Sequence, residues 1–218
     1  MIVFDMSLAS EIQKKIAKPI LTDRELDYLP WTSEASRHNK IKRALKKGEL
    51  IRLKRGVYCL NSDYPTQAVN LFALAQKLYW PSYVSLESAL SYYHLIPEAV
   101  YTITSVTPKN ATEIKTPLGN FSYTHLAFKH FEIGFQRVQT QTAVFLMATP
   151  LKALCDLVHL QKRPYEKLAE LEADLRLNLD ELKVMLRSLS NHEIQNFSKI
   201  YHSKYIDNLV HLLLWELL

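Results

Sequence analysis

Glycine is scarce in this chain of 218 residues, which contains only Gly48, Gly56, Gly119 and Gly134. The closest two are eight residues apart. Walker loops, GxGxxG dinucleotide fingerprints and GxSxG nucleophile elbows all need glycines at shorter spacing. The sequence therefore excludes the enzyme classes that are built on these loops.

Cysteine is equally scarce, since Cys59 and Cys155 are the only two and neither belongs to a CxxC pair. The N-terminus has no basic segment before an apolar run and carries an acid at Asp5. We expect two reduced thiols, neither a disulfide nor a metal framework, and a cytoplasmic location.

Long apolar runs are absent too, because none reaches the roughly 18 residues that a membrane helix requires. The most apolar segment, residues 209–218, is shorter and contains Glu216. We expect it to be a buried terminal helix, and we expect no membrane partner.

Positive charge is present and is concentrated in one part of the chain. The net charge is +5, from 27 basic and 22 acidic residues. Residues 1–62 hold 13 basic and 7 acidic residues, so they carry +6, and the remainder carries −1. Between Ser33 and Arg55, nine basic residues face two acids. Such focused charge is typical of proteins that bind nucleic acid, because basic side chains release counterions condensed on the phosphates.

The local patterns of this basic part predict a winged helix-turn-helix. Apolar spacing predicts three short helices: residues 8–17, a second that starts at the capping box Thr22–Glu25, and a third from Ser33 to about Lys47. Gly48 is placed to end the third helix. Residues 50–60 then alternate apolar and basic side chains around Gly56, which predicts a hairpin with a basic tip.

The third helix and the hairpin are the expected DNA surface. Arginine and asparagine pair with base edges in the major groove, whereas lysines and wing arginines suit phosphates. The expected contacts are Ser36, Arg37, Asn39, Lys40, Arg43, Lys46, Lys47, Arg52, Lys54 and Arg55. The same pattern also occurs in solvated basic helices and hairpins that bind nothing.

A polar, turn-rich stretch at residues 61–65 predicts the boundary between a domain of residues 1–62 and one of residues 63–218. The second domain is expected to contain helices at 67–79 and 85–94, the latter with Ser85 as a simple cap. Strands are expected near 101–106, 121–126, 131–135 and 142–147. A helix should begin at Thr149-Pro150, and the chain from Tyr165 onward should be helical with breaks near Asn178 and Ser190. The fold class is thus α+β: a winged helix-turn-helix followed by a mixed α/β domain with a small sheet and a helical C-terminal part.

Several stretches resemble one protein family. Residues 46–58, KKGELIRLKRGVY, resemble the end of the winged helix in AbiEi-family antitoxins of type IV toxin–antitoxin (abortive infection) systems. Residues 83–90 (YVSLESAL), 101–107 (YTITSVT) and 149–156 (TPLKALCD) resemble three further stretches of that family, in the same order. The likeness runs from about Thr22 to Leu160.

The resemblance implies two activities. The N-terminal domain would bind inverted repeats in its own promoter as a transcriptional repressor, so double-stranded operator DNA is one partner. The C-terminal domain would counter a cognate nucleotidyltransferase-like toxin. Whether it does so by direct contact is left open by the family.

Two alternatives belong to other classes. One is a winged-helix transcriptional regulator whose second domain senses a ligand or a partner. The other is an antitoxin domain with its own enzymatic activity, such as modifying or dephosphorylating the toxin's products. The neighbouring gene discriminates the first from an antitoxin, because an antitoxin should lie beside a nucleotidyltransferase-like gene.

Residues that suggest catalysis or metal binding are few. The segment 192–196 begins like HExxH but ends in Asn196, so it lacks the second zinc ligand. Cys155 and His159 are spaced as a pair on one helix, but Cys155 falls on the apolar stripe. His125 and His130 fit surface or hydrogen-bonded histidines better than ligands. We expect no catalytic residue, no metal and no cofactor.

Overall fold

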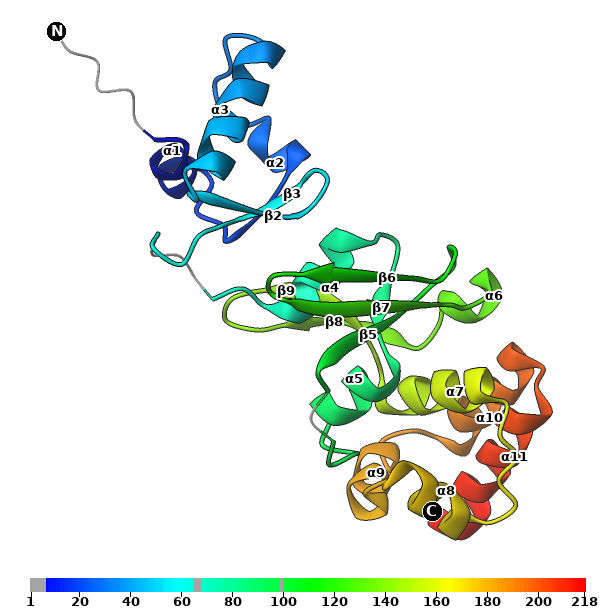
Figure 1. Cartoon of the computed structure of the whole chain (residues 1–218). Helices are drawn as coiled ribbons and strands as arrows, with labels where there is room; N and C mark the ends of the chain where they lie inside the picture. The colour runs from blue at the N-terminus through cyan, green and yellow to red at the C-terminus, as the bar shows by residue number, and fades with distance from the viewer. Residues whose placement is uncertain (1–6, 65–67, 99) are drawn as a thin grey trace, which may run out of the picture.

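The computed structural model describes residues 7–64, 68–98 and 100–218. A small winged-helix module, a six-stranded sheet and a group of C-terminal helices follow one another along the molecule (Figure 1). We call residues 7–64 the winged-helix module and the described residues from 68 onward the second module.

The winged-helix module has three helices and three strands. In chain order they are α1 (Leu8–Lys15), β1 (Ile20–Thr22), α2 (Asp23–Leu26), α3 (Glu34–Lys46), β2 (Leu50–Lys54) and β3 (Val57–Leu60). The strands form an antiparallel sheet in the order β1-β3-β2. The three helices and the hairpin confirm the predicted winged helix-turn-helix. Strand β1 was not predicted, because it is three residues long and exists through its pairing with β3.

The predicted signals at the ends of α3 are confirmed. The Ser33 side chain accepts a hydrogen bond from the Ser36 amide and caps the N-terminus. At the other end Gly48 adopts a positive φ of 72°. The Gly48 amide donates to the Leu45 carbonyl and the Glu49 amide to the Ala44 carbonyl, which is a Schellman ending. The helix that carries most of the basic residues is therefore fixed at both ends.

The wing turns at Arg55 and Gly56. Lys54 pairs with Val57 across the hairpin, so two residues make the turn. Gly56 has φ +75°, and a Cβ at this position would lie 2.5 Å from an Asp23 carboxylate oxygen. The turn therefore requires glycine, both for its backbone conformation and for the close approach of α2.

The second module is built on a mixed sheet in the order β6-β7-β5-β4-β9-β8. Its strands are β4 (Tyr83–Val84), β5 (Thr102–Thr107), β6 (Thr112–Thr116), β7 (Gly119–His125), β8 (Phe135–Gln139) and β9 (Val144–Ala148). The pairs β5–β7 and β4–β9 are parallel, and the other three are antiparallel. Helix α4 (Leu71–Leu78) lies on the side of the sheet toward the winged-helix module, whereas α5 (Leu86–Tyr92) and α7 (Pro150–Gln161) lie on the other side (Figure 1).

Three predictions for this module need correction. Residues 131–135 are not a strand: Phe131 ends the short helix α6 (Phe128–Phe131), and β8 starts only at Phe135. Helix α4 begins at Leu71 with Asn70 as its cap, and the predicted start at Gln67 lies outside the described residues. Ser85 precedes α5 but does not cap it, because its hydroxyl donates to Asp156 instead.

The C-terminal half is helical, as predicted. Thr149 caps α7 and Pro150 occupies its first position. The elements that follow are α8 (Leu168–Leu175), α9 (Leu179–Leu186), α10 (Asn191–Tyr201), α11 (Lys204–Leu212) and the π-helical turn η1 (Leu213–Leu217). Asn178 and Ser190 cap α9 and α10, so both predicted breaks are confirmed. A further break at His202, which has φ +45°, was not predicted.

Two apolar cores meet at the wing sheet. One face of that sheet, with Leu21, Leu50 and Tyr58, packs under α1 and α3. Apolar side chains of the opposite face belong to the larger core, which continues into α4 and the second sheet. Its members from the winged-helix module are Ile20, Leu53, Val57 and Cys59. The two modules are therefore joined by packed side chains as well as by the chain itself.

Candidate nucleic-acid interface

The outer face of α3 is polar and carries a row of exposed side chains. Ile41 and Ala44 turn into the core. Because successive helical residues are 100° apart, the side chains opposite this pair face away from the module. The exposed polar and basic residues of α3 and its C-cap are His38, Asn39, Lys42, Arg43, Lys46 and Lys47.

A groove of about 450 Å³ separates α3 from the wing. On the helix side His38 and Lys42 line it, and on the wing side Arg52 and Arg55 do. The Arg52 guanidinium also lies over the Tyr58 ring, 6.0 Å from its centroid. Cations from two elements thus border the same groove.

Most of these cations have no carboxylate partner. Within residues 7–64, 68–98 and 100–218, Lys42, Arg43, Lys46, Arg52 and Arg55 form no ion pair. Unpaired cations that share one face keep their full attraction for an anionic partner. The groove, which Asp23 and Glu34 also line, and the outer face of α3 therefore carry a group of unpaired cations.

Four expected DNA contacts have partners inside the protein. The Arg37 guanidinium is 2.9 Å from Asp23 and 3.5 Å from Asp27, so it ties α3 to α2. Lys40 pairs with Glu11 of α1 at 3.3 Å. Lys47 lies 3.9 Å from Glu49.

The fourth is Lys54, whose ammonium donates to the Leu78 carbonyl of α4 at 2.9 Å. Ser36 is half-buried, near the side of α3 that faces α1. Of the ten expected residues, Asn39, Arg43 and Lys46 are exposed on α3 and Arg52 and Arg55 line the groove on its wing side, and none of the five forms an ion pair among the described residues.

His38 and Lys42 were not among the predicted DNA contacts. The 100° spacing along the helix places Asn39 and Arg43 on the outer face of α3, but it does not show which flank of α3 faces the wing. Because the wing lies on the side of α3 that carries Leu45, both missed residues line the groove. Their spacing of four residues, on the flank nearest the hairpin, was the available signal.

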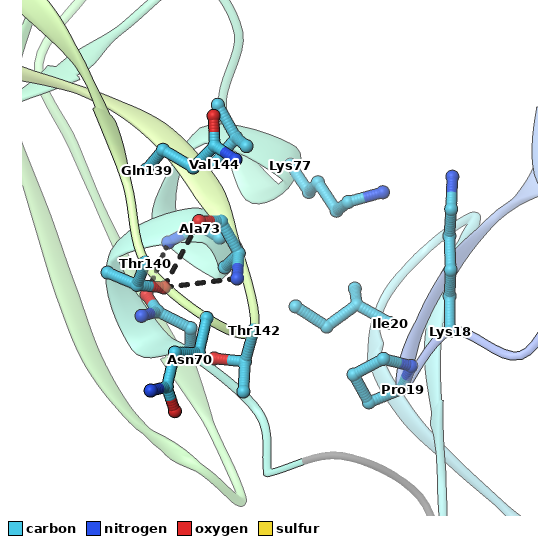
Figure 2. A pocket seen from close by; sticks show the side chains of 12 residues that line it. Lys18, Pro19, Ile20, Asn70, Ala73, Lys77, Gln139, Thr140, Thr142 and Val144 are labelled. Carbon is cyan, nitrogen blue, oxygen red and sulfur yellow. Dashed lines mark hydrogen bonds between the residues drawn. The ribbon is translucent and has the colours of Figure 1, made fainter.

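A second candidate site is a cavity of about 440 Å³ between the modules, shown in Figure 2. Lys18, Pro19 and Ile20 line it from the winged-helix module, and Lys77 reaches toward them from α4 (Figure 2). The opposite wall is the β8–β9 turn, where Thr140 hydrogen-bonds to Ala143. Both lysines bind the carboxylate of Glu25, at 3.2 Å from Lys18 and 2.8 Å from Lys77.

Glu25 is the centre of this contact between the modules. It also closes the capping box of α2 by accepting from the Thr22 amide at 2.8 Å. Burial raises the pKa of Glu25, but hydrogen bonds from Lys77 and Thr22 and the positive charge of Lys77 outweigh it and lower the pKa to about 2. The carboxylate is therefore held ionised between two cations.

A buried charged network lies in the second module, away from both surfaces. Lys152 and Asp156 are one turn apart on α7, 2.8 Å from each other, and almost fully buried. Asp156 accepts from Tyr83, Ser85 and Tyr201. Burial, followed by the charge of Asp156, raises the pKa of Tyr83 and of Tyr201 far above the ordinary range. The network joins β4, α7 and α10, and its inaccessibility indicates a structural role.

Two histidines surround the same tyrosine. The His130 ring stacks on Tyr201 with centroids 4.8 Å apart, and His159 lies 5.0 Å from it. Their buried Nδ1 atoms lack a hydrogen-bond partner within the part of the chain that the structure describes. Burial first, and then the neighbouring ionisable groups His159, Lys129 and Lys152, lower the pKa of His130 to about 4. Burial also lowers the pKa of His159. Both rings therefore stay neutral at physiological pH.

The other sequence motifs have structural explanations. Glu193 accepts from the Ser190 amide and hydroxyl, which makes it part of the α10 capping box. Cys155 is fully buried, and burial raises the pKa of its thiol, which confirms a core position. His125 is exposed, and its Nδ1 lies 2.9 Å from the Lys109 carbonyl.

Neither a metal site nor a membrane segment is found among the described residues. No three histidine, cysteine or acidic side chains gather there as a metal would need. In the same residues no helix combines the length and apolarity that crossing a membrane demands.

Comparison with known proteins and families places the winged-helix module beside a described family. No curated protein matches the chain. A family model does match residues 18–61, from β1 and the segment before it to the end of the wing hairpin. The resembling stretches at 83–90, 101–107 and 149–156 lie outside it. The matched family is described as "Transcriptional regulator, AbiEi antitoxin", so residues 18–61 are similar to this family, which confirms the resemblance predicted for the winged-helix module.

Proposed function

We propose that this chain represses its own promoter by binding operator DNA and counteracts a cognate nucleotidyltransferase-like toxin. The observation that carries the first part is the group of unpaired cations on α3 and the wing: Lys42, Arg52 and Arg55 border one groove, and Arg43 and Lys46 are exposed on α3. A helix of this size fits the major groove, and a basic wing beside it reaches the flanking backbone. The protein would act in the cytoplasm, where the operator and the toxin are found.

We assign different roles to the residues of this interface. Asn39 and Arg43 occupy the outer face of α3 and would read base edges. His38, Lys42, Lys46, Lys47, Arg52 and Arg55 would hold the phosphates and set the register. Arg37 and Lys40 would position α3 through Asp23 and Glu11 rather than contact DNA.

The second part of the proposal assigns toxin neutralisation to residues 63–218, with DNA binding in residues 1–62. It is supported by the split of charge, +6 against −1, and by the separate sheets of the two modules. We propose no catalysis. The buried position of Cys155 and the structural use of Glu193 support this.

Co-expression of the full chain with the toxin tests the division of roles. A variant with Arg43→Glu, Arg52→Glu and Arg55→Glu should lose promoter repression and still restore growth. A variant that loses both activities while folded would show that neutralisation depends on DNA binding. Persistent toxicity with the unaltered chain would exclude the antitoxin role.

The cavity between the modules supports a second candidate, a regulator whose second domain senses a small ligand. The cavity lies between the winged-helix module and the β8–β9 turn, so a ligand bound in it could change the relative position of the two modules. A nucleotidyltransferase-like gene beside this one favours the antitoxin, and its absence favours the ligand-sensing regulator.

A further inference from the structure

A second group of cations lies beside the wing, on the second module. Lys54 of β2 and Lys109, in the turn between β5 and β6, both lie over the ring of Tyr79. Their ammonium groups are 5.3 Å and 5.7 Å from its centroid. Because both ammonium groups lie within 6 Å of the Tyr79 ring centroid, their two charges are at most 12 Å apart.

These two lysines are fixed by the end of α4. Lys54 donates to the carbonyl of Leu78 and Lys109 to the carbonyl of Trp80, at 2.9 Å and 2.7 Å. Free carbonyls at a helix C-terminus attract cations, which accounts for the placement of Lys54. The Trp80 carbonyl that holds Lys109 lies just beyond the C-cap of α4, Tyr79. Each ammonium has three donors, so two of them remain for another partner. Neither lysine forms an ion pair with a carboxylate in the described ranges 7–64, 68–98 and 100–218.

The surroundings of the pair are open to solvent. Both lysines are exposed, and the neighbouring Trp80 is 61% exposed. Tyr79 donates to the Asn110 carbonyl, which holds the turn against α4. An exposed indole beside two cations forms a surface that can pack on a sugar–phosphate backbone while the cations engage phosphates.

The surface formed by Lys54, Lys109 and Trp80 keeps a fixed position relative to the wing. Lys54 is the residue before the wing turn at Arg55 and Gly56. The ion pair between Glu25 and Lys77 and the shared apolar core hold the wing sheet against α4. A duplex bound by the wing would therefore meet this surface at a fixed distance from the wing. Binding would not cost the entropy of ordering a flexible linker between the two.

We propose that Lys54, Lys109 and Trp80 form an additional contact for duplex DNA, so that the footprint runs from the wing onto the second module. The inference rests on the proposed DNA-binding function. The partner is the phosphate backbone flanking the half-site, because the surface offers charge and an aromatic face but no set of donors and acceptors for base edges. It contributes affinity and salt dependence rather than sequence specificity.

The salt dependence of DNA binding tests this contact. The full chain is titrated with a fluorescein-labelled 30-base-pair duplex of random sequence at several KCl concentrations. Each phosphate contact contributes about 0.9 to the slope of log K against log salt. Lys109→Gln keeps a donor for the Trp80 carbonyl but removes the charge, so the slope should fall by about 0.9. Lys109→Arg should restore it, and Lys199→Gln on α10 should match the unaltered protein.

Acrylamide quenching of tryptophan fluorescence gives an independent readout. Because Trp31 lies in the winged-helix module, both proteins also carry Trp31→Phe. Saturating duplex should protect Trp80 in a Trp31→Phe, Trp215→Phe protein and should protect Trp215 little in a Trp31→Phe, Trp80→Phe protein. Binding by the unaltered chain with no slope change in Lys109→Gln and no protection of Trp80 would overturn the extended footprint and leave the DNA-binding function intact. Failure of the unaltered chain to bind any duplex would overturn both.

Discussion

Glu25 of α2 and Lys77 of α4 form an ion pair, 2.8 Å long, that joins the two modules. The Glu25 side chain is 13% exposed and is also bound by Lys18 and by the cap of its own helix. The pair explains how a module with its own small core is held in a defined position. It also makes the contact between the modules measurable through acid titration.

Replacing Glu25 by Gln should weaken this contact. The folded pKa of about 2 lies below the ordinary 4.5, so the stabilisation is fully present above pH 4.5 and is lost as the pH falls toward 2. We expect a loss of about 2 kcal/mol at pH 7, after allowing for solvent screening. Urea denaturation between pH 7 and pH 2 measures both effects.

Glu98→Gln is the matched control, because its ion pair with Arg176 is largely exposed. That variant should lose about 0.5 kcal/mol or less. Equal losses in the two variants would show that the pair between Glu25 and Lys77 contributes no more than an ordinary surface pair.

His130 should make the stability depend on pH in a different range. Its folded pKa of about 4 lies below the ordinary 6.5, so the unfolded chain binds the proton first as the pH falls. Stability is therefore full above pH 6.5 and is lost toward pH 4. We expect His130 to account for about 2 kcal/mol between pH 7.5 and pH 5. Chemical denaturation of His130→Phe should show a smaller loss, and an identical pH profile would contradict the assignment.

Removing one partner of the buried pair in α7 should be costly. Asp156→Ala leaves the Lys152 ammonium buried without its carboxylate, which should cost about 3–5 kcal/mol. A double variant with Lys152→Met and Asp156→Leu removes both charges and should be less destabilised than the single one. Thermal unfolding compares them. A double variant that is as unstable as Asp156→Ala would show that the hydrogen bonds to Tyr83, Ser85 and Tyr201 matter more than the charge.

The two glycines of the winged-helix module should respond differently to alanine. At Gly48, with φ +72°, a Cβ meets nothing closer than 4.0 Å, so the cost is the backbone strain of about 1 kcal/mol. At Gly56 the same strain is joined by a clash with Asp23, the partner of Arg37. We expect Gly56→Ala to be the more destabilising by about 1 kcal/mol or more. Equal unfolding free energies for the two variants would contradict the close approach.

Local signals in the sequence predicted much of the winged-helix module. Thr22, Ser33 and Gly48 act within a few residues of their own positions, so their roles can be read without the fold. Strand β1 could not be predicted in this way, because three residues become a strand only through pairing with β3. Residues 131–135 were predicted to form a strand, whereas Phe131 ends a helix and β8 begins only at Phe135.

The candidate DNA surface was only partly predictable for a related reason. Which cations remain unpaired depends on neighbours far away in the sequence, such as Asp23 for Arg37 and Leu78 for Lys54. The burial of Lys152 could not be predicted either. Its ammonium donates to the Tyr201 hydroxyl, which in turn donates to Asp156, and Tyr201 is 45 residues away from Asp156 in the sequence. Charge counting located the basic module but not the pairing within it.

The central claim is that α3 and the wing bind duplex DNA. Its most direct test is a gel-shift titration of the full chain with the DNA upstream of its own gene. The variant carries Arg43→Glu, Arg52→Glu and Arg55→Glu, and the matched control carries Lys129→Glu, Arg187→Glu and Lys199→Glu, three exposed cations of the second module. We predict that the variant's affinity falls at least about 100-fold, through lost phosphate contacts and new repulsion, while the control loses far less. Equal affinity of the folded variant and the unaltered chain would contradict the account.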